Sequence, residues 1–202
     1  AAGNLELHLH DDGPDFAAWC TYKYLNSGPG SLSGCFIHER HHGNKELPRF
    51  AGWWGHDKKT RFLMGDDFQP ITTAEGWQLS NPPVLSMAAI RASLDIFDQA
   101  GITTLRQKSE KLTAYLAFLI AQEDNKNIRI ITPSDTQNRG CQLSIQMITP
   151  DKKLFNYLTD RGIISDWREP DVIRVAPVPL YNSFEDVWQF SRILHEGLRV
   201  NG

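Results

Sequence analysis

The sequence has few cysteines and no long apolar run. Its 202 residues include only three cysteines, Cys20, Cys35 and Cys141, too few for a disulfide framework in a chain of this length. No apolar stretch approaches the roughly 20 residues that a membrane-spanning helix needs. We therefore expect a reducing, cytoplasmic location and no membrane partner.

An excess of positive charge is also missing. Lysine and arginine number 21 against 24 acidic residues, so the net charge is −3 and a nucleic-acid partner is disfavoured. Repeats and low-complexity tracts are absent from the sequence. No targeting segment follows Ala1, and patterned sequence begins already at Leu5. We expect that the beginning of the protein lies elsewhere.

The first 80 residues predict short strands and long loops. The spacing at 5–10 fits both a strand and a helix. Short apolar runs predict strands at 16–20 and 35–37, joined by a loop rich in glycine and serine. Residues 38–80 show little periodicity and are interpreted as long loops with short strand pieces, a kind of region that often carries function.

The rest of the sequence predicts helices around a small sheet. Serine and prolines at 80–83 predict the start of a helix that runs to Gly101, and a second helix follows. Alternating apolar residues at 141–147 predict a strand with one solvent-exposed face. The remaining expected elements are a strand at 128–132, a helix at 151–161, strands at 162–165 and 172–176, and a last helix opened by a capping box of Ser183 and Asp186.

Lys23 lies between two tyrosines where an apolar strand meets a glycine-rich loop. A partly desolvated amine there could attack a carbonyl and form a Schiff base. The alternative is a strand-end lysine whose amine stays in water. Cys20 is similarly open to two interpretations, and a lone cysteine in an apolar strand favours an inert small hydrophobe over a nucleophile.

A run of Cys35, His38, His41 and His42 resembles a metal-binding spacing. Zinc sites use four protein ligands, or three and a water, and this run has one thiol and no second pair of ligands. We favour an exposed polar loop and predict no metal.

Two other features suggest ligand binding. Trp53 and Trp54 stand between glycines, where the indoles could fill the local core, or one could donate to an anion while the other contacts a flat ligand. Arg174 precedes a proline-stiffened loop, and its planar guanidinium suits a carboxylate. An ordinary charge on an edge strand is the alternative for Arg174.

Four stretches together resemble the kynureninase family, in the family's order and at suitable separations. They are YKYLN at 22–26, GWWGH at 52–56, SNPP at 80–83 and RVAPVPLYNS at 174–183. The resemblance covers essentially the whole chain. It implies an α/β fold of the aspartate-aminotransferase type, fold-type I of the enzymes that depend on pyridoxal 5'-phosphate (PLP). Its C-terminal portion would comprise the end of the large mixed-sheet domain at 1–83, connecting helices at 84–127 and a small α+β domain at 128–202.

The resemblance also implies PLP as cofactor and assigns residues to it. Lys23 would bond covalently to the cofactor and later act as a base. Tyr22 would donate to the phosphate and could also take part in proton transfer. Trp53 would give its indole N–H to the same phosphate, and Asn81 would reach the cofactor.

The activity implied is hydrolysis of the Cβ–Cγ bond of L-kynurenine or 3-hydroxykynurenine, giving an anthranilate and L-alanine. This reaction serves tryptophan catabolism and NAD biosynthesis. Trp54 and Asn81 would line the substrate pocket, and Arg174 would bind the α-carboxylate. A homodimer is expected.

The sequence departs from the family pattern because the family's upstream cofactor residues, including the aspartate that pairs with the pyridinium nitrogen, cannot be assigned here. We expect that the N-terminal half of the enzyme is missing and that the isolated chain is a poor catalyst. Two alternatives stay open, namely another fold-type I enzyme such as a cysteine desulfurase or a β-lyase, and an inactive scaffold fragment.

Overall fold

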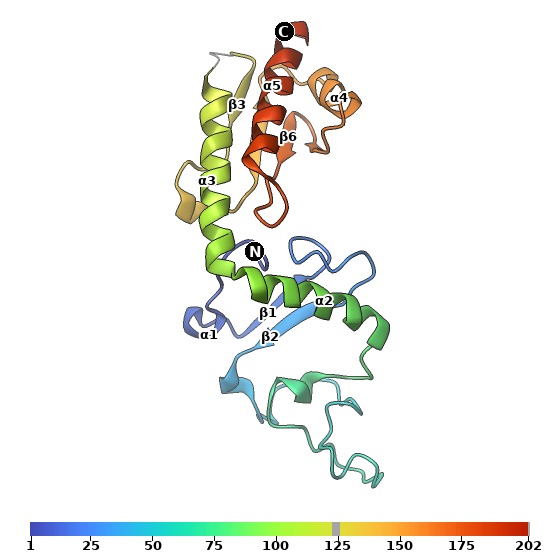
Figure 1. Ribbon diagram of the computed structural model, residues 1–202. Coiled ribbons are helices and arrows are strands. Elements are labelled where there is room, and N and C mark those ends of the chain that lie inside the picture. The colour runs from blue at the N-terminus through green and yellow to red at the C-terminus, as the bar shows by residue number, and fades with distance from the viewer. Residues whose placement is uncertain (123–125, 202) are drawn as a thin grey trace. The chain divides into compact units, whose positions relative to one another are not determined.

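The computed structural model describes residues 1–122 and 126–201 and divides into two compact units, Ala1–Gln99 and Ala100–Gly202 (Figure 1). Residues 123–125, within the predicted connecting segment 84–127, and Gly202, at the end of the predicted domain 128–202, lie outside the described residues. Among the helices of the described part, none is long and apolar enough to cross a membrane.

The first unit contains an antiparallel hairpin of β1 (Phe16–Cys20) and β2 (Ser33–Ile37), which confirms both predicted strands. Trp19 lies opposite Gly34, and a Cβ added to that glycine would overlap the indole ring. The residues of β1 alternate between exposed and half-buried, although the apolar run has the length of a buried strand. A hairpin of two strands offers each face little cover, so apolar side chains such as Phe16 stay exposed within this unit.

The rest of the first unit is mostly loop, as predicted. Of the ambiguous stretch 5–10, only the last two residues are helical, within a short helix α1 (Leu9–Asp12) that ends at Gly13, which has a left-handed φ of 72°. Two 3-10 turns, η1 (Glu39–His41) and η2 (Ala74–Trp77), interrupt the long loops. Helix α2 (Val84–Ala100) begins directly after the two prolines, where the sequence predicts it.

The second unit is a four-stranded antiparallel sheet covered by helices (Figure 1). The strand order is β3-β4-β6-β5, and one contiguous apolar core lies between sheet and helices. The elements are α3 (Ile102–Ala121), β3 (Ile128–Ile130), η3 (Thr136–Asn138), β4 (Leu143–Met147), α4 (Lys153–Asp160), β5 (Asp166–Arg168), β6 (Val172–Val175) and α5 (Phe184–Asn201).

The alternation predicted for β4 is confirmed. Leu143, Ile145 and Met147 are buried in the core, and the residues between them face the other side of the sheet. The same pleat governs β6, where Ile173 and Val175 are buried. Arg174, which lies between these two residues, therefore faces away from the core.

The strand expected at 162–165 is wrong, because β5 begins only at Asp166. The C-terminus of α4 occupies the preceding residues: Gly162 N donates to Thr159 O (3.0 Å), and Ile163 N donates to Leu158 O (3.0 Å). Gly162 has a φ of 79°, as is usual for a glycine that ends a helix. These bonds hold the chain in the helix terminus, so strand pairing begins three residues later.

The loop after β6 is fixed by side chains. The Lys108 ammonium on α3 donates to Pro179 O (2.7 Å), and Val178 N donates to Asn182 Oδ1 (2.9 Å). The proline-rich stretch that follows Arg174 is thus tied both to itself and to a long helix.

The predicted capping box opens α5. Ser183 N donates to Asp186 Oδ2 (2.7 Å), and Asp186 N donates to Ser183 Oγ (3.1 Å). Hydrogen bonds from the backbone and hydroxyl of Ser183 lower the pKa of the Asp186 carboxyl from its usual 3.8.

Asp186→Asn should therefore destabilise the protein at neutral pH but not in strong acid. The carboxylate has a lower pKa in the folded state, so its contribution is present above the unfolded value of 3.8 and is lost as pH falls through the folded value. Urea unfolding of the wild type and of Asp186→Asn, measured at several pH values, should give unfolding midpoints that converge at low pH. Glu185→Gln, which removes a neighbouring charge of the same turn, is the control. A midpoint difference that does not depend on pH would contradict the prediction.

Candidate functional site

Lys23 lies in a tight turn at the end of β1. Ser27 N donates to Thr21 O (3.2 Å), Asn26 N donates to Lys23 O (2.9 Å), and the Thr21 hydroxyl bonds to Leu32 O. Asn26 adopts a left-handed φ of 55°, which asparagine tolerates better than most residues. The backbone is thereby held while the Lys23 side chain is exposed. Solvent reaches this side chain in the chain described, and both interpretations of the lysine stay open.

Tyr22 stands beside this amine. Its side chain is 48% exposed, and the Lys23 ammonium lies 5.9 Å from the centroid of its ring. The neighbouring Cys20, through a hydrogen bond and its charge when ionised, raises the pKa of the Tyr22 phenol above its usual 10.0. The phenol is therefore protonated at neutral pH and is available as a hydrogen-bond donor.

The tryptophan pair differs in environment. Trp53 is 58% exposed and contacts Phe62 edge to face, with ring centroids 5.7 Å apart. Trp54 is half-buried under the Arg61 guanidinium, whose carbon lies 4.8 Å from the ring centroid. Arg61 also donates to the carbonyls of Trp54 (2.9 Å) and His56 (3.0 Å). Trp54 is thus packed locally, whereas the Trp53 indole is accessible.

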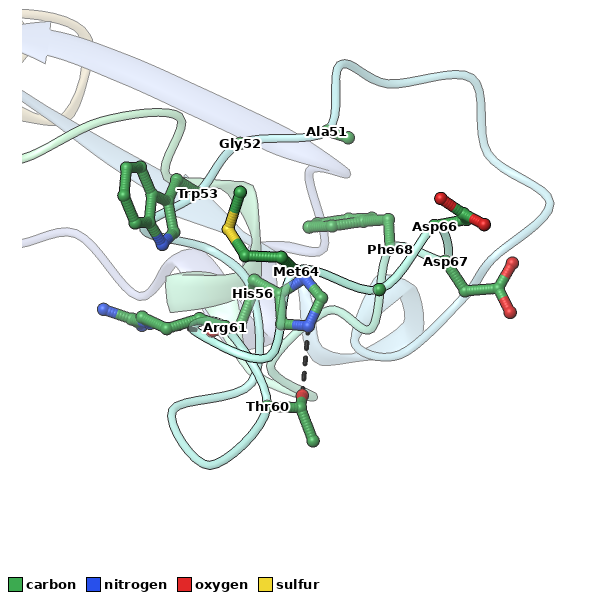
Figure 2. Close-up of a pocket in the computed structure, with 11 residues that line it drawn as sticks. Ala51, Gly52, Trp53, His56, Thr60, Arg61, Met64, Asp66, Asp67 and Phe68 are labelled. Carbon is green, nitrogen blue, oxygen red and sulfur yellow. Dashed lines mark hydrogen bonds between the residues drawn. The ribbon is translucent and has the colours of Figure 1, made fainter.

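Trp53 borders a pocket of about 330 Å³ (Figure 2). Every residue that lines this pocket comes from the segment 51–68. The His56 ring nitrogen Nε2 bonds to the Thr60 hydroxyl (3.0 Å), and Phe68 meets His56 edge to face. Two carboxylates, Asp66 and Asp67, stand at its rim beside these rings (Figure 2).

Glycines allow the backbone around the tryptophans to pack closely. A Cβ on Gly52 would overlap the Leu79 backbone, and one on Gly55 would overlap the Gly76 carbonyl. Ile71 N also donates to Gly55 O (2.9 Å). Leu79, two residues before Asn81, therefore lies against the tryptophan loop. Asn81 itself is exposed.

The predicted cofactor residues fall into two groups within the first unit. The loop 21–32, which includes Tyr22 and Lys23, lies at one end of the β1–β2 hairpin in Figure 1, and the segment 51–68 lies beyond the other side of the hairpin. No residue of the loop 21–32 lines the pocket beside Trp53. One copy of the unit therefore does not bring the two groups together.

The cysteine–histidine run lies on and after β2. Cys35 is exposed, the His41 ring bonds to Asp15 Oδ1 (2.8 Å), and the His42 ring bonds to Ile37 O (3.2 Å). The His41 ring and the nearby Arg40 guanidinium lower the pKa of the Asp15 carboxyl. Within residues 1–122 and 126–201, no group of three or more histidine, cysteine, aspartate or glutamate side chains is arranged to hold a metal ion.

Arg174 lies in the second unit and contacts a carboxylate of its own chain. Its Nε donates to Asp166 Oδ2 (2.7 Å), and its Nη2 bonds to the same oxygen. Sequence reasoning missed Asp166, because the strand before Arg174 was expected at 162–165. With that strand placed at 166–168, Asp166 and Arg168 alternate with Trp167 and so share one face, and the pairing with β6 places Asp166 opposite Arg174.

Comparisons with known proteins agree with the resemblance found in the sequence. Residues 105–194 match the family model described as the kynureninase C-terminal domain. The chain is 60% identical over 193 residues to a protein named kynureninase from Myxococcus xanthus, and 52% identical over 204 residues to one from Flavobacterium psychrophilum. It covers 45% and 48% of these relatives, so it spans about half their length.

Solved structures confirm the fold class. An apo cysteine desulfurase from Thermococcus onnurineus superposes with a TM-score of 0.76 over 99% of this chain and 51% of its own, at 17% identity. The cystine C-S lyase C-DES gives 0.73 over 96% of this chain and 50% of its own, also at 17% identity. The chain thus has the fold of about half of a fold-type I PLP enzyme, and at this identity the likeness concerns the fold alone.

The glycine packing beside Trp53 gives a test of the site's geometry. Gly52→Ala should lower the free energy of unfolding by about 1–3 kcal/mol, because the Leu79 backbone must move to admit the methyl group. Urea titration followed by tryptophan fluorescence measures this. Gly65→Ala, in the same pocket lining but with no atom within 4 Å of the added Cβ, is the matched control. Equal losses in both variants would contradict the packing described.

Proposed function

The chain is homologous to the kynureninases along nearly its whole length, and from this relationship we propose that the complete protein is a PLP-dependent kynureninase. It would hydrolyse the Cβ–Cγ bond of L-kynurenine or 3-hydroxykynurenine to an anthranilate and L-alanine, in tryptophan catabolism and NAD biosynthesis. The observation that carries the proposal is identity of 52–60% over 94–100% of this chain.

Lys23 and Tyr22 fit a cofactor that has an aldehyde and a phosphate. The exposed amine, on a backbone held by three hydrogen bonds, is accessible to an aldehyde. The phenol beside it keeps its proton at neutral pH, as a donor to a phosphate oxygen must. When bound, pyridoxal phosphate would supply an electron sink for bonds at the substrate Cα.

The residues of this chain would then move protons and orient the substrate. The Lys23 amine, freed when substrate binds, would take the proton from the substrate Cα and pass it to the bound cofactor. Tyr22, adjacent to it in the chain, could pass a proton onward. Water adds to the γ-carbonyl before the Cβ–Cγ bond breaks, and anthranilate leaves before alanine.

A second copy of the chain would complete the cofactor site. The segment 51–68 lies apart from the loop 21–32 of its own unit, yet Trp53 is exposed, and an indole N–H is a donor that suits a phosphate. We assign Trp53 and Asn81 to the cofactor and Trp54 and Asn81 to the substrate pocket, within a homodimer in which one subunit offers these residues to the other.

Arg174 is proposed to bind the substrate α-carboxylate. Its guanidinium is 31% exposed, so a ligand can reach it, and it faces away from the apolar core. We also propose that residues 1–83 end the large cofactor domain, that 84–127 connect, and that 128–202 form the small domain. The two compact units divide within this proposed connecting segment, between Gln99 and Ala100. A cytoplasmic location, in keeping with a chain that has only three cysteines, belongs to the same proposal.

Lys23→Ala should abolish kynurenine hydrolysis by the complete protein. Borohydride reduction of the PLP-loaded wild type should label the peptide that contains Lys23, and mass spectrometry would identify it. Lys45→Ala, which alters another exposed lysine of the same unit, is the control and should behave as wild type. Labelling of a different lysine would exclude this assignment. Turnover of cysteine rather than kynurenine would favour a desulfurase.

Arg174→Ala should weaken substrate binding by about 2–5 kcal/mol, the range for losing one member of a charged hydrogen-bonded pair. Cofactor loading should stay unchanged, because Arg174 is proposed to contact the substrate and not the cofactor. Steady-state kinetics with L-kynurenine and the absorbance of the bound cofactor measure the two effects. Arg192→Ala, on the exposed face of α5, is the control. Unchanged kinetics in the Arg174 variant would refute its role.

A further inference from the structure

Three polar residues form a row across the outer face of the sheet in the second unit. Ser144 on β4 and Asp166 on β5 both lie directly opposite Arg174 on β6. Residues in register on neighbouring strands share one face, so the three side chains are neighbours on the side away from the core. Arg174 is the middle member of this row.

Asp166 holds one edge of the Arg174 guanidinium. Nε (2.7 Å) and Nη2 both bond to Asp166 Oδ2, and the Nε of Arg168 lies 3.0 Å from the same oxygen. In the part of the chain that the structure describes, these are the bonds that the Arg174 side chain makes. The other edge, formed by Nη1 and the second N–H of Nη2, remains for a ligand.

The charges in this cluster favour an anionic ligand. Two guanidinium groups share one carboxylate, so these three side chains together carry a net positive charge. Arg174 chiefly, with Arg168, lowers the pKa of the Asp166 carboxyl, which is therefore ionised throughout the neutral range. A second carboxylate on the free edge of Arg174 would balance the cluster, and a planar fork accepts a carboxylate on each edge.

The strand that carries Asp166 is fixed from the opposite face. Trp167 points to the core side, where it packs against Phe155 with ring centroids 5.9 Å apart. The Lys152 ammonium lies 5.4 Å from the same indole. This anchor holds a strand of three residues in place, so the carboxylate next to Trp167 has a defined position.

We propose that Asp166 is a positioning residue, which orients the Arg174 guanidinium so that its free edge binds the α-carboxylate of the amino-acid substrate. This inference rests on the proposed function and adds to it a residue without substrate contact. Arginine has several rotatable bonds, and an unrestrained guanidinium would lose more conformational entropy on binding the ligand. Holding one edge beforehand reduces that loss.

Kinetics of the complete, PLP-loaded protein test the role of Asp166. Asp166→Ala should raise KM for L-kynurenine about tenfold while kcat stays within about twofold, because the lost contact affects binding in ground and transition states alike. The preference for L-kynurenine over its decarboxylated amine should fall by a similar factor. Asp166→Asn should show a smaller effect, because its amide oxygen can still accept from Nε.

Glu169→Gln is the matched control. It removes a carboxylate from the same segment, but Glu169 pairs with Lys152 (2.5 Å) rather than with Arg174. Urea unfolding of all variants reports any general weakening of β5. Unchanged KM in Asp166→Ala, or an equal rise for kynurenine and the decarboxylated amine, would overturn the inference while leaving the proposed function standing. Failure of the wild type to hydrolyse kynurenine would overturn the proposed function, and the role of Asp166 with it.

Discussion

The pleat of β6 is the constraint that places Arg174, the residue proposed to bind the substrate carboxylate. Ile173 and Val175 are buried beneath the helices, so the residue between them must face outward. A shift of one residue in the pairing with β4 would bury a guanidinium and expose Ile173. Apolar burial therefore fixes the position of a charged side chain that contributes nothing to the core.

The first unit is held together by different means. Its loops contact one another through close backbone approaches at glycines. Arg61 donates to the Trp54 carbonyl, and the Ser93 hydroxyl bonds to Leu25 O, whereas the second unit has a contiguous apolar core. Many large apolar side chains of this unit are exposed, among them Phe50, Phe62, Leu63, Met64, Val84 and Leu85. In the proposed homodimer, the rest of the enzyme and the second subunit would cover such surfaces.

Local patterns predicted much of this structure, and the failures occurred where distant segments decide the outcome. The capping box at Ser183 depends on residues three apart, and the alternation of β4 depends on one strand, so both could be read from the sequence. The position of β5 depends on where α4 ends, and its pairing with β6 selects Asp166 as the neighbour of Arg174. The environments of Trp53 and Trp54 depend on contacts with Phe62 and Arg61, which no local spacing reveals.

The two edge strands of the sheet, β3 and β5, are three residues long, and each contains an arginine, Arg129 or Arg168. Short edges with charged side chains give a foreign strand few free backbone groups to pair with. Arg168, which shares Asp166 with Arg174, thus also belongs to a feature that discourages the growth of this sheet from one molecule to the next and so limits aggregation through strand edges.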